Sequence, residues 1–433
     1  MTEKTVYLVG GMRTPFLKAR GKPGPFSAAD LGVAAAQALL LRTNLSGAEL
    51  DQVITGCVMP SSNEANIARV IGLRLNVGYQ VPAWTVQRNC ASGLQALATA
   101  ANAIRFGGQD LILTGGTEAM SRAPLLCNEH YIRWLAQWSQ SATLWQRVKQ
   151  LGRLRPQFFA PVIALLQGLT DPVVGLSMGQ TAENLAYRFG ISREAMDEFA
   201  LQSQLRAAAG YAQGHFAEIL PIFDNHGHVY DQDDGVRPES NLEKLAQLKP
   251  FFDKPFGTVT PGNSSQITDG AVMVLLASKE AVLKYQLPVQ GKILGTHWAG
   301  VDPAQMGLGP AHAVPPLLAR FGLNPGDIDC WEINEAFAVQ VMACIQAWQD
   351  KDYCRKELAL PGAFGIVDVN KLNVDGGAIA LGHPVGASGA RLALHVAQML
   401  ARTEGRYGVA TLCIGGGQGG AMLIERCTEV EDD

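Results

Sequence analysis

Short apolar runs and longer amphipathic stretches alternate along most of this sequence. The short runs are rich in valine, isoleucine and leucine and predict strands, whereas the longer stretches, rich in alanine and leucine, predict helices. In the first third, we predict strands at 5–11, 52–56, 81–86 and 111–116 and helices at 28–41, from 66 onward and at 94–104. Because strands that alternate with helices commonly form βαβ units, we expect a mainly parallel sheet.

The last third, from about residue 290, returns to the same alternation. Strands are predicted at 328–333, 407–413 and 421–424, and the glycine-rich segment 376–391 opens a helix. Near both ends of the chain, a strand leads into a glycine-rich turn that carries a reactive side chain, and a helix follows. We therefore predict an internal duplication of a βα unit, without close sequence identity between the copies.

Between about 122 and 244 the pattern changes, which indicates an inserted loop domain. Its first part, 131–170, contains three of the seven tryptophans and has no acidic residue, but it has five basic ones: Arg133, Arg147, Lys149, Arg153 and Arg155. Six apolar side chains fall near one helical face: Tyr131, Trp134, Leu135, Trp138, Trp145 and Val148. A basic amphipathic stretch with tryptophan is typical of a segment that lies on an anionic membrane surface. The alternative is a helical pair packed on the protein's own body or on a partner subunit.

Composition narrows the class of protein. The chain has 433 residues, of which 47% are hydrophobic and 17% charged, so it is long enough for two or three domains with large cores. The net charge of −4 gives no overall basic field for nucleic acid. Eight cysteines form no CxxC pair, the start does not resemble a signal peptide, and no apolar run reaches the ~20 residues of a membrane span. We expect free thiols and a reducing, cytosolic compartment.

The most informative stretch is the turn around Cys90, between the predicted strand 81–86 and the predicted helix 94–104. Backbone N–H groups and the positive end of the helix meet at such a turn, and both lower the pKa of a thiol. Gly93 would let the backbone approach another segment closely. A buried cysteine that merely opens a core helix is the plain structural explanation.

Three further loops carry useful chemistry: Asn334, His383 and Cys413. A histidine near a cysteine is the usual means of activating a thiol. Cys413 precedes a run of glycines whose N–H groups could surround an oxyanion. Taken singly, each has an ordinary explanation: a helix N-cap for Asn334, a surface loop for His383 and a buried strand thiol for Cys413. Together, the four loops point to one catalytic site.

The residues of these loops resemble a known family. Asn89-Cys90-Ala91-Ser92-Gly93, Asn334-Glu335-Ala336-Phe337, Gly382-His383-Pro384 with Gly386 and Gly389, and Cys413-Ile414-Gly415-Gly416-Gly417 resemble the four signatures of the thiolases, in the same order and at similar spacings. The resemblance implies the α/β thiolase fold, in which two similar halves form five layers, α-β-α-β-α. The halves would be 1–121, completed by about 245–278, and 279–433, with 122–244 as the loop domain.

Within the thiolases, the basic insert and the length resemble the β subunit of the trifunctional fatty-acid oxidation complex. That resemblance implies a hydratase–dehydrogenase α subunit as a partner. Several such subunits carry His-Glu-Ala-Phe, whereas this chain has Asn334-Glu335-Ala336-Phe337, as stand-alone thiolases do. The family resemblance also implies a homodimer or homotetramer. We expect a cytoplasmic enzyme, peripheral at the inner membrane if 131–170 contacts lipid.

The resemblance implies cleavage of a 3-oxoacyl-CoA by free CoA, through an acyl group carried on a cysteine. Cys90 would be the nucleophile, His383 its base, and Cys413 the acid and base for the substrate carbon. The thioester oxygen would face His383 and a water held by Asn334, and the tetrahedral oxygen would face the N–H groups of Cys90 and Gly415. Coenzyme A is then a co-substrate, and no metal or resident cofactor is expected.

Five further residues resemble substrate contacts of the family. They are Arg237 near the CoA nucleotide, Ser265 and Met178 along the pantetheine channel, and Met306 and Phe337 at the acyl pocket. Many thiolases have His-Met-Gly where this chain has Ser177-Met178-Gly179, which favours a longer acyl chain. The alternatives are an acetyl-CoA acetyltransferase that forms acetoacetyl-CoA, a condensing enzyme of the ketoacyl-synthase type, and a non-catalytic lipid carrier. Cys413 and Asn334 argue against the condensing enzyme.

Overall fold

A ten-stranded mixed sheet forms the body of the protein, and the computed structural model describes residues 3–430. Five neighbouring strands belong mainly to the first half: β1 (Tyr7–Arg13), β10 (Thr268–Ala277), β5 (Leu111–Ala119), β3 (Gln52–Gly56) and β4 (Ala83–Val86), with β2 (Leu17–Lys18) paired to β10. Four belong to the second half: β11 (Gly291–Gly300), β14 (Gln418–Glu425), β13 (Tyr407–Ile414) and β12 (Cys330–Ile333). A short pairing of β1 with β11 joins the two sets.

The predicted duplication is visible in the order of the strands. The order β1-β10-β5-β3 in one half matches β11-β14-β13-β12 in the other, and in both the first two pairings are antiparallel and the third is parallel. The prediction of a mainly parallel sheet is wrong. The predicted strands are present, but the neighbours of each strand in the sheet differ from those expected. Strand β10 comes from beyond the loop domain and inserts antiparallel between β1 and β5.

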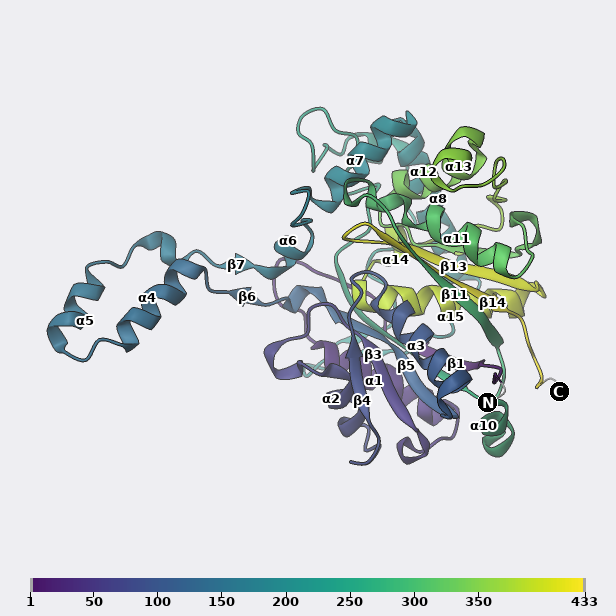
Figure 1. The fold of residues 1–433 in the computed structure, drawn as a ribbon, viewed down its shortest axis with the longest axis horizontal. Coiled ribbons are helices and arrows are strands. Elements are labelled where there is room, and N and C mark those ends of the chain that lie inside the picture. Colours follow the sequence, from purple (N-terminus) through teal and green to yellow (C-terminus); the bar gives the residue numbers. More distant parts are fainter. Residues whose placement is uncertain (1–2, 431–433) are drawn as a thin grey trace.

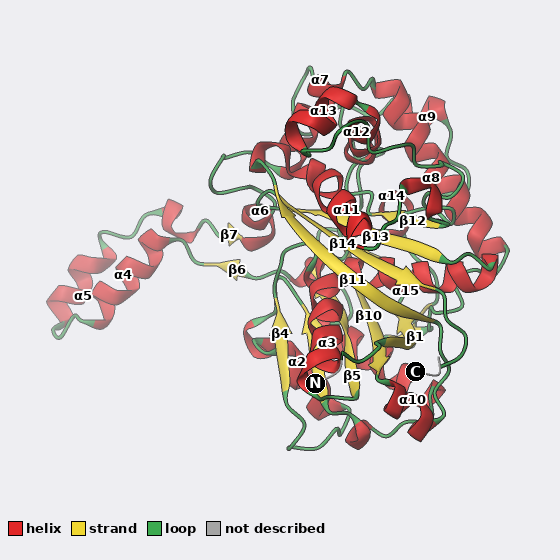
Figure 2. Ribbon diagram, turned by 45° about the vertical axis from the view of Figure 1, so that its right-hand side comes forward, coloured by secondary structure: helices red, strands yellow, loops and turns green. Residues whose placement is uncertain are grey.

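Helices separate and cover the two halves of the sheet, which gives the five layers of the expected fold (Figures 1 and 2). The central layer consists of α3 (Ser92–Gly107) and α15 (Val385–Thr403), which pack on each other. A Cβ on Gly93 would lie 2.8 Å from Gly386 O, so the close approach predicted for Gly93 is confirmed. The outer layers contain α1 (Ala28–Arg42), α2 (Ile67–Arg74) and α10 (Lys279–Tyr285) on one side, and α11 (Gly309–Arg320), α12 (Ala338–Gln349) and α13 (Lys351–Glu357) on the other.

The loop domain packs over the second half. Its main elements are α7 (Met178–Phe189), α8 (Arg193–Ala212), the hairpin of β8 (Ile222–Phe223) and β9 (Val229–Tyr230), and α9 (Leu242–Ala246). Helix α8 contacts α14 (Ala378–Leu381), which leads directly into the His383 loop. We propose that residues 1–121, completed by about 245–278, form the first half, that 279–433 form the second half, and that 122–244 form the loop domain. No helix within residues 3–430 combines the length and apolar character that a membrane span requires.

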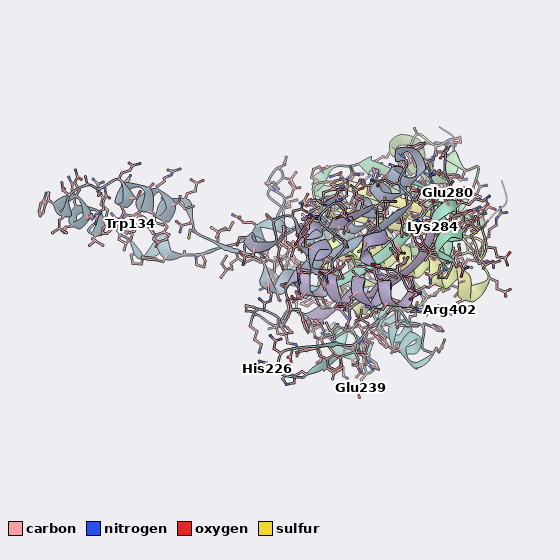
Figure 3. The ribbon with its side chains drawn as sticks, turned by 90° about the horizontal axis from the view of Figure 1, so that it is seen from below. Trp134, His226, Glu239, Glu280, Lys284 and Arg402 are labelled. Atoms are coloured by element: carbon pink, nitrogen blue, oxygen red, sulfur yellow. The ribbon has the colours of Figure 1, made fainter. Side chains whose placement is uncertain are left out.

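The basic insert forms a helical hairpin that projects far from the body (Figures 1 and 3). Its elements are the two-stranded stalk of β6 (Leu125–Leu126) and β7 (Val162–Ile163), the helices α4 (Glu129–Ser139) and α5 (Leu144–Leu151), and α6 (Ala164–Gly168) at its foot. The prediction of one apolar face is wrong, because the chain turns between α4 and α5. Trp134 stacks on Tyr131 and Trp138 and donates to Gln150 O (2.9 Å) inside the hairpin, whereas Trp145 is 77% exposed.

Candidate active site

The Cys90 turn is fixed to the glycine-rich loop of the other half. Asn89 has a φ of +43°, a conformation that asparagine tolerates better than most residues, and its Nδ2 donates to Gly415 O (2.7 Å). The Ser92 hydroxyl donates to Asn89 O (2.7 Å) and closes the first turn of α3. These bonds bring together two of the four predicted loops, 326 residues apart in the chain.

Burial raises the pKa of the Cys90 thiol, although the N–H groups of Gly415 and of Cys90 itself point to the sulfur and oppose this effect. The prediction of a lowered pKa at this helix start is therefore wrong. Loss of water around the sulfur outweighs the two N–H dipoles. Cys90 rests as a thiol at neutral pH, and a base must remove its proton before it can act as a nucleophile.

The His383 ring is held in one orientation. The Ser388 hydroxyl donates to Pro384 O (3.0 Å), so the short contact from His383 Nδ1 to Ser388 Oγ (2.6 Å) places the ring proton on Nδ1. Nε2 then carries a lone pair and accepts from Asn334 Nδ2 (3.4 Å). The predicted neighbours Asn334 and His383 are thus in contact, and the ring nitrogen at this contact is the basic one.

Burial, and then the positive charge of Arg391, lower the pKa of His383 to about 4. The imidazole is therefore neutral at physiological pH and is ready to accept a proton. Arg391 is itself buried and pairs with Glu332 on β12, two residues before Asn334.

Cys413 lies at the end of β13 and is 1% exposed. Its pKa lies well above the ordinary thiol value because of burial and then because of an electrostatic interaction with the Cys90 thiol. The two predicted cysteines are therefore neighbours. A buried thiol of raised pKa is protonated at neutral pH and can donate a proton to a carbanion.

A cavity of about 650 Å³ opens beside these groups. Its lining includes four of the predicted residues: Met178, Ser265, Phe337 and His383. The Met178 sulfur lies 3.4 Å from the Cβ position of Gly415, so this wall reaches the Cys90 turn. The cavity is largely apolar, with Phe251, Phe252 and several residues at the foot of the hairpin: Leu166, Leu169 and Thr170.

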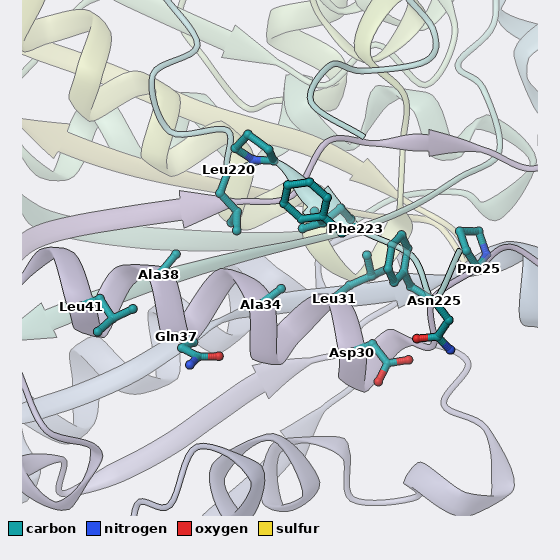
Figure 4. A pocket seen from close by; sticks show the side chains of 13 residues that line it. Pro25, Asp30, Leu31, Ala34, Gln37, Ala38, Leu41, Leu220, Phe223 and Asn225 are labelled. Atoms are coloured by element: carbon teal, nitrogen blue, oxygen red, sulfur yellow. The ribbon is translucent and has the colours of Figure 1, made fainter. Parts of the chain in front are cut away.

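Two predicted substrate residues lie outside this cavity. Met306 is 3% exposed and packs in the core beneath α7 and α12, so its role at the acyl pocket stays a prediction. Arg237 is exposed and lines a separate hollow of about 510 Å³ together with Lys244 and Leu248. A further cavity of about 550 Å³ lies between α1 and the β8 segment and contains none of the predicted site residues (Figure 4).

Comparison with known families agrees with this geometry. The model of the thiolase N-terminal domain matches residues 6–280, and that of the thiolase C-terminal domain matches residues 287–426. The chain belongs to the thiolase family. It is an acyltransferase of the thiolase type.

Relatives of this thiolase match along nearly their whole lengths. A beta-ketoadipyl-CoA thiolase of Acinetobacter baylyi is 40% identical, with 98% of this chain and all of the relative covered. The human mitochondrial 3-ketoacyl-CoA thiolase is 38% identical (97% and 98% covered), and the bovine trifunctional enzyme subunit beta is 34% identical (98% and 88% covered).

Solved structures give the same result. The crystal structure of human mitochondrial 3-ketoacyl-CoA thiolase in complex with CoA is 37% identical, covers 98% of both chains and has a TM-score of 0.83. The Bacillus anthracis acetyl-CoA acetyltransferase is 34% identical, with a TM-score of 0.84 over 98% of this chain and all of that one.

Two buried residues near the site of this thiolase, Ser388 and Glu118, were not predicted from the sequence. Ser388 lies five positions after His383, on the first turn of α15, and only the folded helix shows that it holds the ring. Glu118 on β5 accepts from Val58 N (2.8 Å) and Met59 N (3.0 Å), and burial raises its pKa to about 7. A glutamate inside the apolar run 111–119 was the available signal, since a buried charge needs partners.

Proposed function

We propose that this thiolase cleaves 3-oxoacyl-CoA by CoA-dependent thiolysis through an acyl group on Cys90. One observation carries the proposal: the thiols of Cys90 and the buried Cys413 interact, and the segment of His383 packs against the Cys90 helix through Gly386 and Gly93. His383 is neutral, and its basic Nε2 is in contact with Asn334 Nδ2. One thiol, one base and one acid are what the two proton transfers of this reaction require.

In the first half-reaction, His383 Nε2 takes the Cys90 proton and the sulfur attacks the 3-oxo carbon. The C2–C3 bond breaks, the acyl group stays on Cys90, and the electron pair remains on the departing acetyl-CoA enolate. Cys413 then donates its proton to C2. Its raised pKa supports this role, because the group must hold a proton until the carbanion forms.

In the second half-reaction, free CoA takes the acyl group. The Cys413 thiolate removes the CoA thiol proton, the CoA sulfur attacks the acyl carbon, and Cys90 leaves as a thiolate. The proton stored on His383 returns to Cys90. Both cysteines and the histidine thus recover their starting protonation states.

Two sites would stabilise negative oxygen in these steps. The N–H groups of Cys90 and Gly415, which already point to the Cys90 sulfur, would serve the tetrahedral oxygen. Asn334 and His383 would serve the thioester oxygen. One such donor contributes about 3 kcal/mol at a transition state. Asn334 Oδ1 is buried without a hydrogen-bond partner among the described residues, which leaves it free to orient a water or the substrate.

We propose fatty-acid β-oxidation as the role and a fatty 3-oxoacyl-CoA as the substrate. The apolar lining of the cavity and the names of the 3-ketoacyl-CoA thiolase relatives support this choice. A thiolysis assay with 3-oxoacyl-CoA substrates of increasing chain length tests it. We expect cleavage that depends on free CoA and releases acetyl-CoA, and no cleavage at any length would contradict the proposal.

We propose that the enzyme is a homodimer built on β4. This strand pairs with β3 and has no second strand partner within residues 3–430, and its Trp84 is 40% exposed. An exposed sheet edge with an aromatic side chain favours pairing with another chain. Sedimentation should give the mass of at least two chains, and a Trp84→Lys variant should dissociate; a monomeric wild type would contradict this proposal.

We propose that the helical hairpin contacts an anionic membrane, so that the cytoplasmic enzyme is peripheral at the inner membrane. Arg147, Lys149 and Arg153 make no ion pair with any residue of the described chain, and Leu144 and Trp145 beside them are 80% and 77% exposed. Each basic residue near an anionic surface contributes about 1 kcal/mol. Charge and apolar contact would therefore act together.

Vesicle binding tests the membrane proposal. Replacement of Arg147, Lys149 and Arg153 by glutamate should weaken binding to anionic liposomes by about a hundredfold or more. Thiolysis of a short-chain substrate should survive, and neutral liposomes or added salt should weaken binding of the wild type. A matched variant reverses three exposed charges on α13: Lys351, Arg355 and Lys356.

A partner protein is the other outcome of that experiment. The bovine relative is named as the beta subunit of a trifunctional enzyme, which supports a hydratase–dehydrogenase α subunit as a partner. If the wild type ignores liposomes but the triple variant changes the mass of the assembly, the hairpin binds protein. If neither responds, the membrane proposal is wrong.

A further inference from the structure

Lys18 is a lysine that none of the four loops contains, yet it lines the same cavity as His383. It ends β2, which pairs with the start of β10 so that Lys18 lies opposite Thr268. Two residues before Thr268, Gln266 also lines the cavity and accepts a hydrogen bond from His383 N (3.2 Å). The pairing of β2 with β10 thus brings a lysine from the first twenty residues to the wall of the candidate active site.

The Lys18 ammonium is partly buried and forms no ion pair with a carboxylate of the described chain. Its Nζ makes no hydrogen bond or ion pair with any residue between 3 and 430. Burial, and then the positive charges of Arg237 and Arg20, lower its pKa. The one nearby carboxylate, Asp234, is already used, because its Oδ2 accepts from Lys18 N (3.1 Å) and from Arg20 (3.3 Å).

Arg237 lies close enough to act on Lys18, although the two residues line different hollows. Lys18 belongs to the cavity with His383, and Arg237 belongs to the hollow with Lys244. The positive charge of Arg237 nevertheless reaches the Lys18 ammonium. The partly buried Lys18 thus lies near the positive charges of Arg20 and Arg237 and near the single carboxylate of Asp234, and this excess of positive charge favours the binding of an anion.

We infer that Lys18 binds a phosphate group of coenzyme A, beside the nucleotide contact that the family resemblance implies for Arg237. The inference rests on the proposed function, in which CoA enters the cavity with its thiol toward Cys90. CoA carries a diphosphate and a 3′-phosphate at the end remote from the thiol, and lysine and arginine are the usual partners of such groups. Lys18 is then a binding residue for the co-substrate and takes no part in the proton transfers.

The test compares Lys18→Met with the wild type for three nucleophiles: CoA, dephospho-CoA, which lacks the 3′-phosphate, and pantetheine, which lacks every phosphate. Methionine keeps the length and flexibility of lysine without the charge. We expect the KM for CoA to rise about tenfold, with kcat changed by less than twofold, because one charge-assisted bond in a half-buried site is lost. The KM for pantetheine should be unchanged.

Dephospho-CoA identifies which phosphate is bound. If the rise in KM persists with dephospho-CoA, Lys18 binds the diphosphate; if it disappears, Lys18 binds the 3′-phosphate. Lys18→Arg should restore most of the affinity for CoA, because it restores the charge. Lys284→Met is the matched control, since Lys284 lies at the end of the molecule opposite the hairpin (Figure 3), and it should leave every KM unchanged.

Two results would overturn the inference. An unchanged KM for CoA in Lys18→Met would show that Lys18 does not bind CoA. An equal rise with pantetheine would show that the substitution acts through the shape of the cavity. Failure of the proposed function is distinguishable from both, because the wild type itself would then show no CoA-dependent thiolysis.

Discussion

Replacement of Ser388 by alanine isolates the bond that sets the proton on His383. The Ser388 hydroxyl accepts from His383 Nδ1 at 2.6 Å and donates to Pro384 O, and both side chains are buried. Without the hydroxyl, the Nδ1–H group has no hydrogen-bond partner, and the tautomer with the proton on Nδ1 is no longer favoured. In the other tautomer Nε2 carries the proton and cannot accept one from Cys90.

The size of the effect follows from the burial of the ring. A buried donor left without a partner costs about 1–3 kcal/mol. Because every 1.4 kcal/mol is a factor of ten, the population of the basic tautomer, and with it kcat/KM for thiolysis, should fall by about ten- to a hundredfold. The melting temperature should change little in comparison, since the site lies in a large core.

Two assays separate this role from a general loss of structure. The first is kcat/KM for thiolysis of a short 3-oxoacyl-CoA. The second is the rate at which iodoacetamide labels Cys90 between pH 5 and 8, which reports the assistance of His383 in forming the thiolate. We expect both to fall together in Ser388→Ala. Wild-type values in both assays, in a variant that melts normally, would refute the assigned orientation of the ring.

Three further predictions concern ionisation and the second thiol. Because the pKa of His383 is lowered to about 4, the pH profile of kcat/KM should show its acid limb near pH 4; a limb near 6.5 would contradict the burial of the ring. Because the folded pKa of Glu118 is about 7, above its unfolded value, the folded state holds the extra proton and loses about 3 kcal/mol of stability between pH 4.5 and 7. The free energy of unfolding of Glu118→Gln should therefore lack this loss, so that the stability of the variant rises relative to that of the wild type as the pH increases. If the free energies of unfolding of both proteins changed with pH in the same way, the raised pKa would be contradicted. Cys413→Ala should still accept an acyl group on Cys90 from a reactive thioester but should not exchange the α-protons of acetyl-CoA, and exchange at the wild-type rate would exclude Cys413 as the acid and base.

Much of the fold and the positions of the reactive loops could be predicted from the sequence. Apolar runs located the strands around 52–56, 81–86 and 111–116, because a fully buried strand leaves a local pattern. The Cys90 turn and the four loop signatures are also local features. The antiparallel direction of β10 was not predictable from periodicity, since the choice of neighbouring strand depends on contacts across more than a hundred residues.

The electrostatics of the site could not be derived from position along the chain. The turn at Cys90 correctly predicted nearby N–H groups, but the loss of water that raises the thiol pKa depends on segments from the other half. The same is true of Ser388 and Lys18, whose roles arise from the helix α15 and the pairing of β2 with β10. Helical periodicity also failed to predict which side chains of the hairpin are exposed. The chain turns within 131–170, and part of the expected apolar face is therefore packed between the helices of the hairpin.

Mass spectrometry of the enzyme, quenched after mixing with a 3-oxoacyl-CoA in the absence of free CoA, tests the central claim most directly. We expect one acyl group per chain on the peptide that contains Cys90, its release on addition of CoA, and no adduct in Cys90→Ser, because a hydroxyl is a far weaker nucleophile here than an activated thiol. An acyl group on another residue, or near-normal turnover in Cys90→Ser, would contradict the account.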